Sequence, residues 1–166
     1  MTIAEPEQRW AELGRQACLT LAPLFSAVEH IGSTAVPGLP AKPIIDLQLS
    51  VARIDPVEAY REPLERLGYL FVPDPESPDF HLFARPAERP RTHHLHVCES
   101  GSDHERRHVA VRDFLRAHPD AAAEYEALKR SLAAEHPQDR LAYIEGKAAF
   151  MALLEAQALS SFSSSS

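Results

Sequence analysis

The sequence predicts an α+β (α/β mixed) fold, in which a mixed β-sheet is backed by helices and the C-terminal portion is helical. Two observations lead to this prediction. Strand-like segments lie mostly in the first two thirds of the chain, whereas apolar residues recur at helical spacing after Ser102. With 166 residues, the chain matches one ordinary domain that can bury its own core. We expect a single domain over residues 1–159, followed by a disordered serine-rich tail over residues 160–166.

The first third of the chain predicts one helix and two strands. Apolar residues at helical spacing indicate an amphipathic helix over residues 6–21. A short strand over residues 25–31 then runs into a Gly-Ser pair, and the Pro- and Gly-rich stretch that follows cannot form a long regular element. The aliphatic run IIDLQLSV, residues 44–51, is typical of a largely buried strand.

The middle of the chain predicts a helix over residues 56–67, which Gly68 closes. Three strand candidates follow, over residues 69–72, 80–85 and 94–98.

Three helices complete the expected fold, and Pro119 and Pro137 separate them. They cover residues 103–118, residues 120–135 and a final segment that contains Met151.

Charge and composition exclude several classes of protein. A net charge of −7 argues against general nucleic-acid binding, because sequence-independent phosphate binding needs a basic surface. No apolar run reaches the roughly 20 residues of a membrane span, and the start MTIAEPEQRW is unlike a signal peptide. We therefore expect a cytoplasmic protein that does not enter a membrane. Lysine is scarce and occurs only as Lys42, Lys129 and Lys147.

The turn at Gly32 and Ser33 is the first candidate for a functional site. A strand that ends in a sharp Gly-Ser turn exposes backbone N–H groups and a hydroxyl, which together can hold phosphate oxygens. Asp46 lies in the middle of an apolar strand, where a carboxylate must be paired, hydrogen-bonded or metal-bound. A purely structural aspartate bonded to loop amides is the alternative.

A second candidate is the segment RTHHLHV, residues 91–97. His94 and His96 are two residues apart on a strand, so they point to the same face and could join Asp46 as metal ligands. Core or surface histidines would show the same pattern. Arg91 and Lys42 could contact a phosphate, and so could Arg112, although solvated loop and helix positions explain them equally well.

Four segments together resemble the GrpB family, and the resemblance covers roughly residues 8–155. They are EHIGSTAVPGLPAKPIIDLQLSV, RTHHLHV, VRDFLRAHPDAAAEYEALK and the pair formed by Tyr143 and Lys147. That family is assigned to the nucleotidyltransferase-like superfamily, and one version of it is fused behind bacterial dephospho-coenzyme A kinase. The resemblance implies that Gly32 and Ser33 meet the triphosphate of a nucleotide and that Asp46 is the first metal-binding carboxylate.

The chain departs from the pattern of that superfamily at two places. The usual Asp-x-Asp pair is Asp46-x-Gln48 here, and the strand expected to carry a third acid offers His94 and His96. One carboxylate with two imidazoles suits a transition metal better than magnesium. We expect a divalent metal ion, Mg²⁺, Mn²⁺ or Zn²⁺, held by Asp46, His94 and His96, with Asp46 as the catalytic carboxylate.

Three functions remain open on the sequence alone. The first is metal-dependent transfer of a nucleotidyl group from a nucleoside triphosphate to a small-molecule acceptor. The second is a non-catalytic nucleotide-binding or folding and regulatory module, as the kinase-fused relatives would allow. The third is a metal- or histidine-dependent phosphoesterase, although Cys98 occupies the position where a third alternating histidine would be needed.

Overall fold

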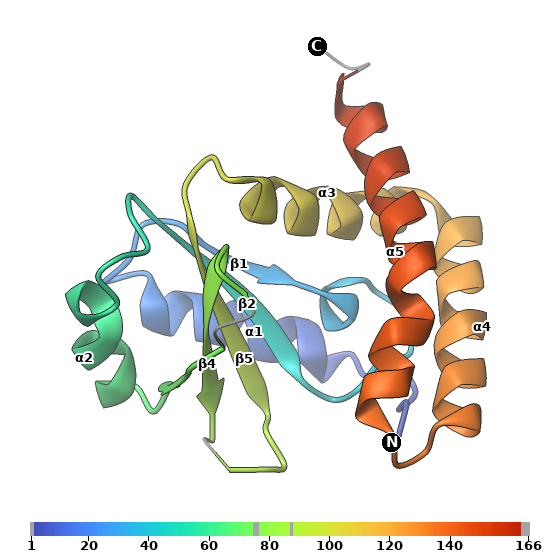
Figure 1. Cartoon of the computed structure of the whole chain (residues 1–166), viewed down its shortest axis with the longest axis horizontal. Coiled ribbons are helices and arrows are strands. Elements are labelled where there is room, and N and C mark those ends of the chain that lie inside the picture. Colours follow the sequence, from blue (N-terminus) through green and yellow to red (C-terminus); the bar gives the residue numbers. More distant parts are fainter. Residues whose placement is uncertain (1, 75–76, 87, 164–166) are drawn as a thin grey trace.

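In the computed structural model of the chain, five strands form one mixed sheet at the centre of the molecule (Figure 1). The structure describes residues 2–74, 77–86 and 88–163. The spatial order is β1-β2-β5-β4-β3; β2 and β5 are parallel, and the other three neighbouring pairs are antiparallel. The strands are β1 (Val28–Ile31), β2 (Ile45–Val51), β3 (Leu70–Val72), β4 (Phe80–Arg85) and β5 (His93–Glu99).

Helices surround this sheet and make up the C-terminal third of the chain, where α4 and α5 run side by side (Figure 1). Within the described residues the helices are α1 (Arg9–Leu21), the 3₁₀ turn η1 (Ser33–Ala35), α2 (Glu58–Arg66), α3 (Asp103–Ala117), α4 (Pro119–Glu135) and α5 (Arg140–Ser163).

One face of the sheet forms the main hydrophobic core. Alternation along β2 and β5 points Leu47, Leu49 and Leu95 to this face, and each of them is fully buried. The core continues through Trp10 and Leu21 of α1 and also includes residues of α2. Burial of this apolar surface is the main force that holds α1 and α2 on the sheet.

The opposite face carries the polar residues of the same strands. Asp46 pairs with His94, and Gln48 pairs with His96, so these four side chains share one face. This face looks toward α3 and the helical C-terminal portion, where a second apolar cluster joins the loop after η1 to α3, α4 and α5. The C-terminal helices therefore cover the polar face without filling it with apolar side chains.

The predicted fold class is confirmed, and every expected helix and strand is present: β4 has the expected ends, and each of the other elements with stated bounds is shifted at one or both ends. The strand expected to start at residue 25 starts at Val28, because the N–H of Phe25 is still bonded to the carbonyl of Leu21 at the end of α1. Helix α5 continues through Ser163 and so includes residues 160–163 of the segment expected to be a disordered tail. Residues 164–166 lie outside the described residues. Among the described helices, none combines the length and apolar character needed to span a membrane.

Candidate functional site

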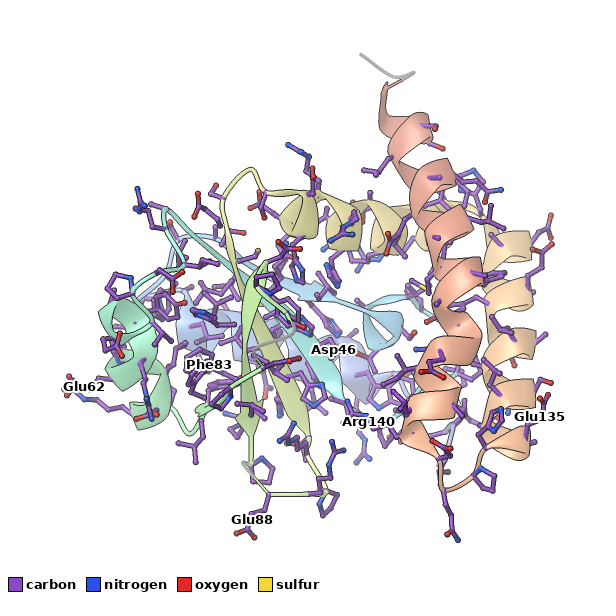
Figure 2. All side chains as sticks on the ribbon, viewed as in Figure 1. Asp46, Glu62, Phe83, Glu88, Glu135 and Arg140 are labelled. Atoms are coloured by element: carbon purple, nitrogen blue, oxygen red, sulfur yellow. The ribbon has the colours of Figure 1, made fainter. Side chains whose placement is uncertain are left out.

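A cavity of about 550 Å³ lies between the polar face of the sheet and the helices α4 and α5. Figure 2 shows two of its lining residues, Asp46 on the sheet and Arg140 near the start of α5. Strands β2 and β5 contribute Asp46, His94 and His96, and the turn after β1 contributes Gly32 and Ser33. The remaining ionisable lining residues come from loops and from α3, α4 and α5: Lys42, Arg89, His108, Tyr125, Lys129, Arg140, Tyr143 and Lys147.

Strand register brings the Gly-Ser turn against Asp46. Ile31 is the antiparallel partner of Asp46, so Gly32 follows directly beside that carboxylate. Gly32 has φ +72° and ψ −173°, a conformation that is essentially restricted to glycine. A Cβ atom added at Gly32 would lie 2.8 Å from Oδ2 of Asp46. The structure thus requires glycine at this position for the backbone angles and for the approach to Asp46.

Asp46 and His94 form the polar centre of the sheet side. Nδ1 of His94 lies 3.3 Å from Oδ1 of Asp46, with side-chain exposures of 14% and 30% respectively. Burial acts to raise the pKa of Asp46, but the hydrogen bond from His94 and the nearby imidazoles of His96 and His108 outweigh it, so the pKa is lowered. Asp46 is therefore an ionised carboxylate that opens on the cavity.

All three lysines of the chain line this cavity. The ammonium groups of Lys42 and Lys147 lie 4.2 Å and 4.8 Å from the ring centroid of Tyr143. That of Lys129 lies 4.6 Å from the ring centroid of Tyr125. These are cation–π distances, so each ammonium group is held over a ring at the cavity wall.

Lys129 is the most buried of the three, with 2% of its surface exposed. Its ammonium group donates to the hydroxyl of Ser33 at 3.3 Å and to the carbonyl of Pro40. Burial, followed by the charge of Lys147, lowers the pKa of Lys129 to about 7, and burial likewise lowers that of Lys42 to about 8. The amines are thus kept close together in a confined space, where an anion would stabilise their charged forms.

Two candidates from the sequence, Arg112 and Arg91, are absent from the lining of this cavity, and so is Gln48, which stands where a second acid was expected. The Arg112 guanidinium donates to Glu29, to Asp113 and to the carbonyl of His30, and it lines a smaller neighbouring cavity of about 90 Å³. Arg91 is absent from the described lining, and burial, followed by the charges of Arg89 and Arg140, lowers its pKa. Gln48 is 2% exposed and donates to the carbonyl of Glu105 in α3 at 3.3 Å. The residue at the position of a second acid is therefore engaged with α3.

Three histidines meet where β5 faces α3. They are His96, His104 and His108, and within the described residues they are the one set of three His, Cys, Asp or Glu side chains whose ligand atoms all lie within 4.8 Å of one another. Burial lowers the pKa of His96 to about 4 and that of His104 to about 3. The set includes His96 but neither Asp46 nor His94.

Several residues of the cavity and of the histidine cluster were missed or assigned another role from the sequence. His104 and His108 carried a signal, since their i, i+4 spacing puts both on one helix face. The Tyr-x-x-x-Lys spacings of Tyr125 with Lys129 and of Tyr143 with Lys147 predict, on the sequence alone, simple packing of the lysine stems over the rings. The scarcity of lysine does not indicate where the three lysines lie, so their meeting at one cavity was not predicted from the sequence.

Comparison with known proteins identifies relatives over nearly the whole chain. The sequence model of one family, described as GrpB protein, matches residues 1–157. A crystal structure of conserved protein GrpB from Enterococcus faecalis is 33% identical, with a TM-score of 0.85, and the match covers 97% of this chain and 99% of that one. The UPF0157 protein YqkA of Bacillus subtilis is 38% identical over 144 residues, which are 84% of this chain and 42% of the relative. A dephospho-CoA kinase of Mycolicibacterium paratuberculosis is 32% identical over 147 residues, 72% of this chain and 35% of that protein.

The chain spans about half the length of the first curated relatives, 42% and 55% of their residues. The full match to the Enterococcus faecalis structure extends the likeness from sequence to fold.

Proposed function

The chain belongs to the GrpB family, and from that premise we propose that it is a nucleotidyltransferase-like protein whose cavity binds a nucleoside triphosphate. The observation that carries the proposal is the charge of the cavity lining. Three lysines and two arginines line the cavity, and Asp46 is the single carboxylate among the described lining residues. The net charge of the whole chain is −7, so these cations are concentrated in the cavity while the rest of the molecule is acidic.

Such a lining suits a polyphosphate. Ammonium groups bind phosphate oxygens through strong charge-assisted hydrogen bonds, and guanidinium groups bind them in a bidentate manner. The cavity volume of about 550 Å³ falls within the usual range for small-molecule sites. Ser33 adds a hydroxyl beside Lys129 and next to the glycine that contacts Asp46.

Asp46 favours transfer chemistry over simple anion binding. A pure anion site gains nothing from an ionised carboxylate, whereas Mg²⁺ is commonly held by one or two carboxylates together with the phosphates of its nucleotide. An ion held in this way by Asp46, with His94 orienting the carboxylate, would offset charge on the leaving pyrophosphate. On this account the activity is nucleotidyl transfer from the nucleoside triphosphate to a small-molecule acceptor.

A non-catalytic nucleotide-binding module is the second candidate, and Gln48 favours it. The residue that would supply the second acid is neutral, buried and bonded to α3. The relative named dephospho-CoA kinase matches this chain over 35% of its own length, so a chain of this kind also occurs as part of a longer protein.

Calorimetric titration with the four ribonucleoside triphosphates, in Mg²⁺ and in EDTA, tests the proposal. Replacement of Lys147 by methionine keeps the length of the stem and removes the charge. Losing one charge-assisted contact, about 1.5–3 kcal/mol, should weaken binding by roughly 10- to 150-fold. Arg66→Met is the matched control, because Arg66 is 72% exposed on α2 and lies outside the cavity lining.

Asp46→Asn tests by the sign of its effect whether Asp46 binds the metal ion that nucleotidyl transfer needs. If Asp46 binds the ion that accompanies the nucleotide, the variant binds more weakly in Mg²⁺ but equally or more tightly in EDTA, where it removes a repulsive charge. If Asp46 has no metal role, the variant binds at least as tightly in both buffers, which favours the non-catalytic module. Absence of nucleotide binding by the folded wild-type protein would refute both candidates.

A further inference from the structure

The histidines His96, His104 and His108 form a cluster that the proposed nucleotide site does not use fully. The ring centroids of His104 and His108 are 4.2 Å apart, and that of His96 lies 5.6 Å and 5.5 Å from them. One nitrogen of each ring lies within 4.8 Å of the other two. The sequence positions are far enough apart that this approach depends on the docking of α3 on the sheet.

Local structure fixes the two helix histidines. The hydroxyl of Ser102 caps α3 by accepting from the N–H of Glu105 at 3.2 Å, which sets where the helix begins. Residues i and i+4 then share a face, so His104 and His108 both point toward His96 of β5. Phe80 of β4 stacks against His96 and His104 at 4.9 Å and 4.4 Å, and this packing holds their rings in place.

Two buried nitrogens of the cluster have no partner among the described residues. They are Nε2 of His104, a residue only 5% exposed, and Nδ1 of His96. A buried polar atom without a hydrogen bond costs free energy, so native proteins rarely keep one without a reason. A bound ion would provide that reason for both atoms at once.

The third histidine is already oriented as metal-binding histidines usually are. Nδ1 of His108 lies 2.9 Å from the carbonyl of His104, which fixes the ring and leaves Nε2 to act as a ligand. Metal-bound histidines commonly donate their other ring N–H to a carbonyl or carboxylate in this way.

We propose that His96, His104 and His108 bind a divalent transition metal ion, with Zn²⁺ as the best match to three imidazoles. Three protein ligands with one open position are typical of catalytic zinc sites. The open position would face the cavity, because His96 and His108 line it. Tetrahedral ligands at about 2.1 Å from zinc lie about 3.4 Å apart, so the nitrogens need to draw together by at most about 1.4 Å.

This site keeps His96 from the ligand set expected on the sequence and replaces Asp46 and His94 by His104 and His108. The proposal does not depend on nucleotide binding. Asp46 remains available for the ion of a bound nucleotide, and the two sites would lie in one cavity.

The test measures zinc affinity of the tag-free full chain, by competition with a chromophoric chelator, together with elemental analysis of the purified protein. His104→Phe is the main variant, since it keeps an aromatic ring stacked on Phe80 and removes both nitrogens. His108→Ala is the second variant. Its matched control is His118→Ala, because exposed His118 makes the same bond to a helix carbonyl, to Phe114 at 2.8 Å. Thermal unfolding without zinc shows that each variant folds.

The wild-type protein is expected to bind one zinc ion per chain. Loss of a direct ligand should weaken zinc binding by more than the roughly 10- to 100-fold that loss of a supporting residue costs. Cobalt should give the absorption of a tetrahedral site in the wild type and in His118→Ala, but not in His104→Phe. Zinc affinity that is absent in the folded wild type, or unchanged in both His104→Phe and His108→Ala, would overturn the proposal. So would zinc binding that Asp46→Asn abolishes and His104→Phe does not.

Discussion

Replacing Gly32 by alanine tests the contact that positions Asp46. The added Cβ would lie 2.8 Å from Oδ2 of Asp46 and 3.1 Å from its Cβ, too close for either atom to stay in place. The backbone adds a second cost, because φ +72° with ψ −173° is essentially a glycine conformation and costs other residues about 1–3 kcal/mol. Overpacking contributes about 1–3 kcal/mol more. The variant should therefore lose about 2–6 kcal/mol of unfolding free energy and shift the carboxylate of Asp46.

Gly101→Ala is the matched control for this experiment. Gly101 also has a positive φ, +77°, but an added Cβ meets no atom within 4 Å. Chemical denaturation should show the control losing only the backbone cost, about 1–2 kcal/mol. Calorimetry in Mg²⁺ should show weakened nucleotide binding for Gly32→Ala and unchanged binding for Gly101→Ala. Equal losses of stability in the two variants, with nucleotide binding intact in both, would refute the assignment of Gly32 as the residue that positions Asp46.

Two further predictions concern buried contacts. The pKa of Lys129 is lowered to about 7 in the folded protein, so above that pH the unfolded chain binds more protons than the folded protein does. The free energy of unfolding should therefore rise with pH. Between about pH 7.5 and 9 this contribution reaches up to about 2 kcal/mol. Urea denaturation of Lys129→Met should therefore show a flatter dependence of the unfolding free energy on pH than the wild type does. Identical slopes in the two proteins would mean that the pKa of Lys129 is not lowered. Gly14→Ala should destabilise the protein, because the added Cβ would lie 2.1 Å from Nδ1 of His30. The steric clash should outweigh the helix propensity of alanine, which favours the variant by about 1 kcal/mol. A raised melting temperature of the variant would contradict the packing of His30 against Gly14.

Most of the fold is predictable from sequence because local signals agree with one another. The aliphatic run of β2 and the alternation of β5 indicate which side chains face the core, and both strands form as expected. Shared faces follow from the same alternation, so Asp46, His94 and His96 point to one side of the sheet. The ends of elements are less predictable, since the turn at Leu24 and Phe25 depends on hydrogen bonds to Leu21.

The site is less predictable because it is assembled by docking of distant elements. Lys42, Lys129 and Lys147 come from a loop and two helices, and no local pattern indicates that they line one cavity. Arg112 illustrates the reverse case. Its sequence context suits an anion contact, but Glu29, which is 83 positions away, pairs with its guanidinium. Such pairings depend on tertiary packing and are invisible to spacing arguments.

A crystal structure of the protein with Mg²⁺ and a non-hydrolysable nucleoside triphosphate would show where the nucleotide binds. We expect the triphosphate to lie in the cavity of about 550 Å³, within hydrogen-bond distance of Lys147 and Ser33, with the magnesium ion on Asp46. A nucleotide bound instead in the cavity of about 640 Å³ beside Gln48 and Glu105, with the lysine-lined cavity empty, would contradict it.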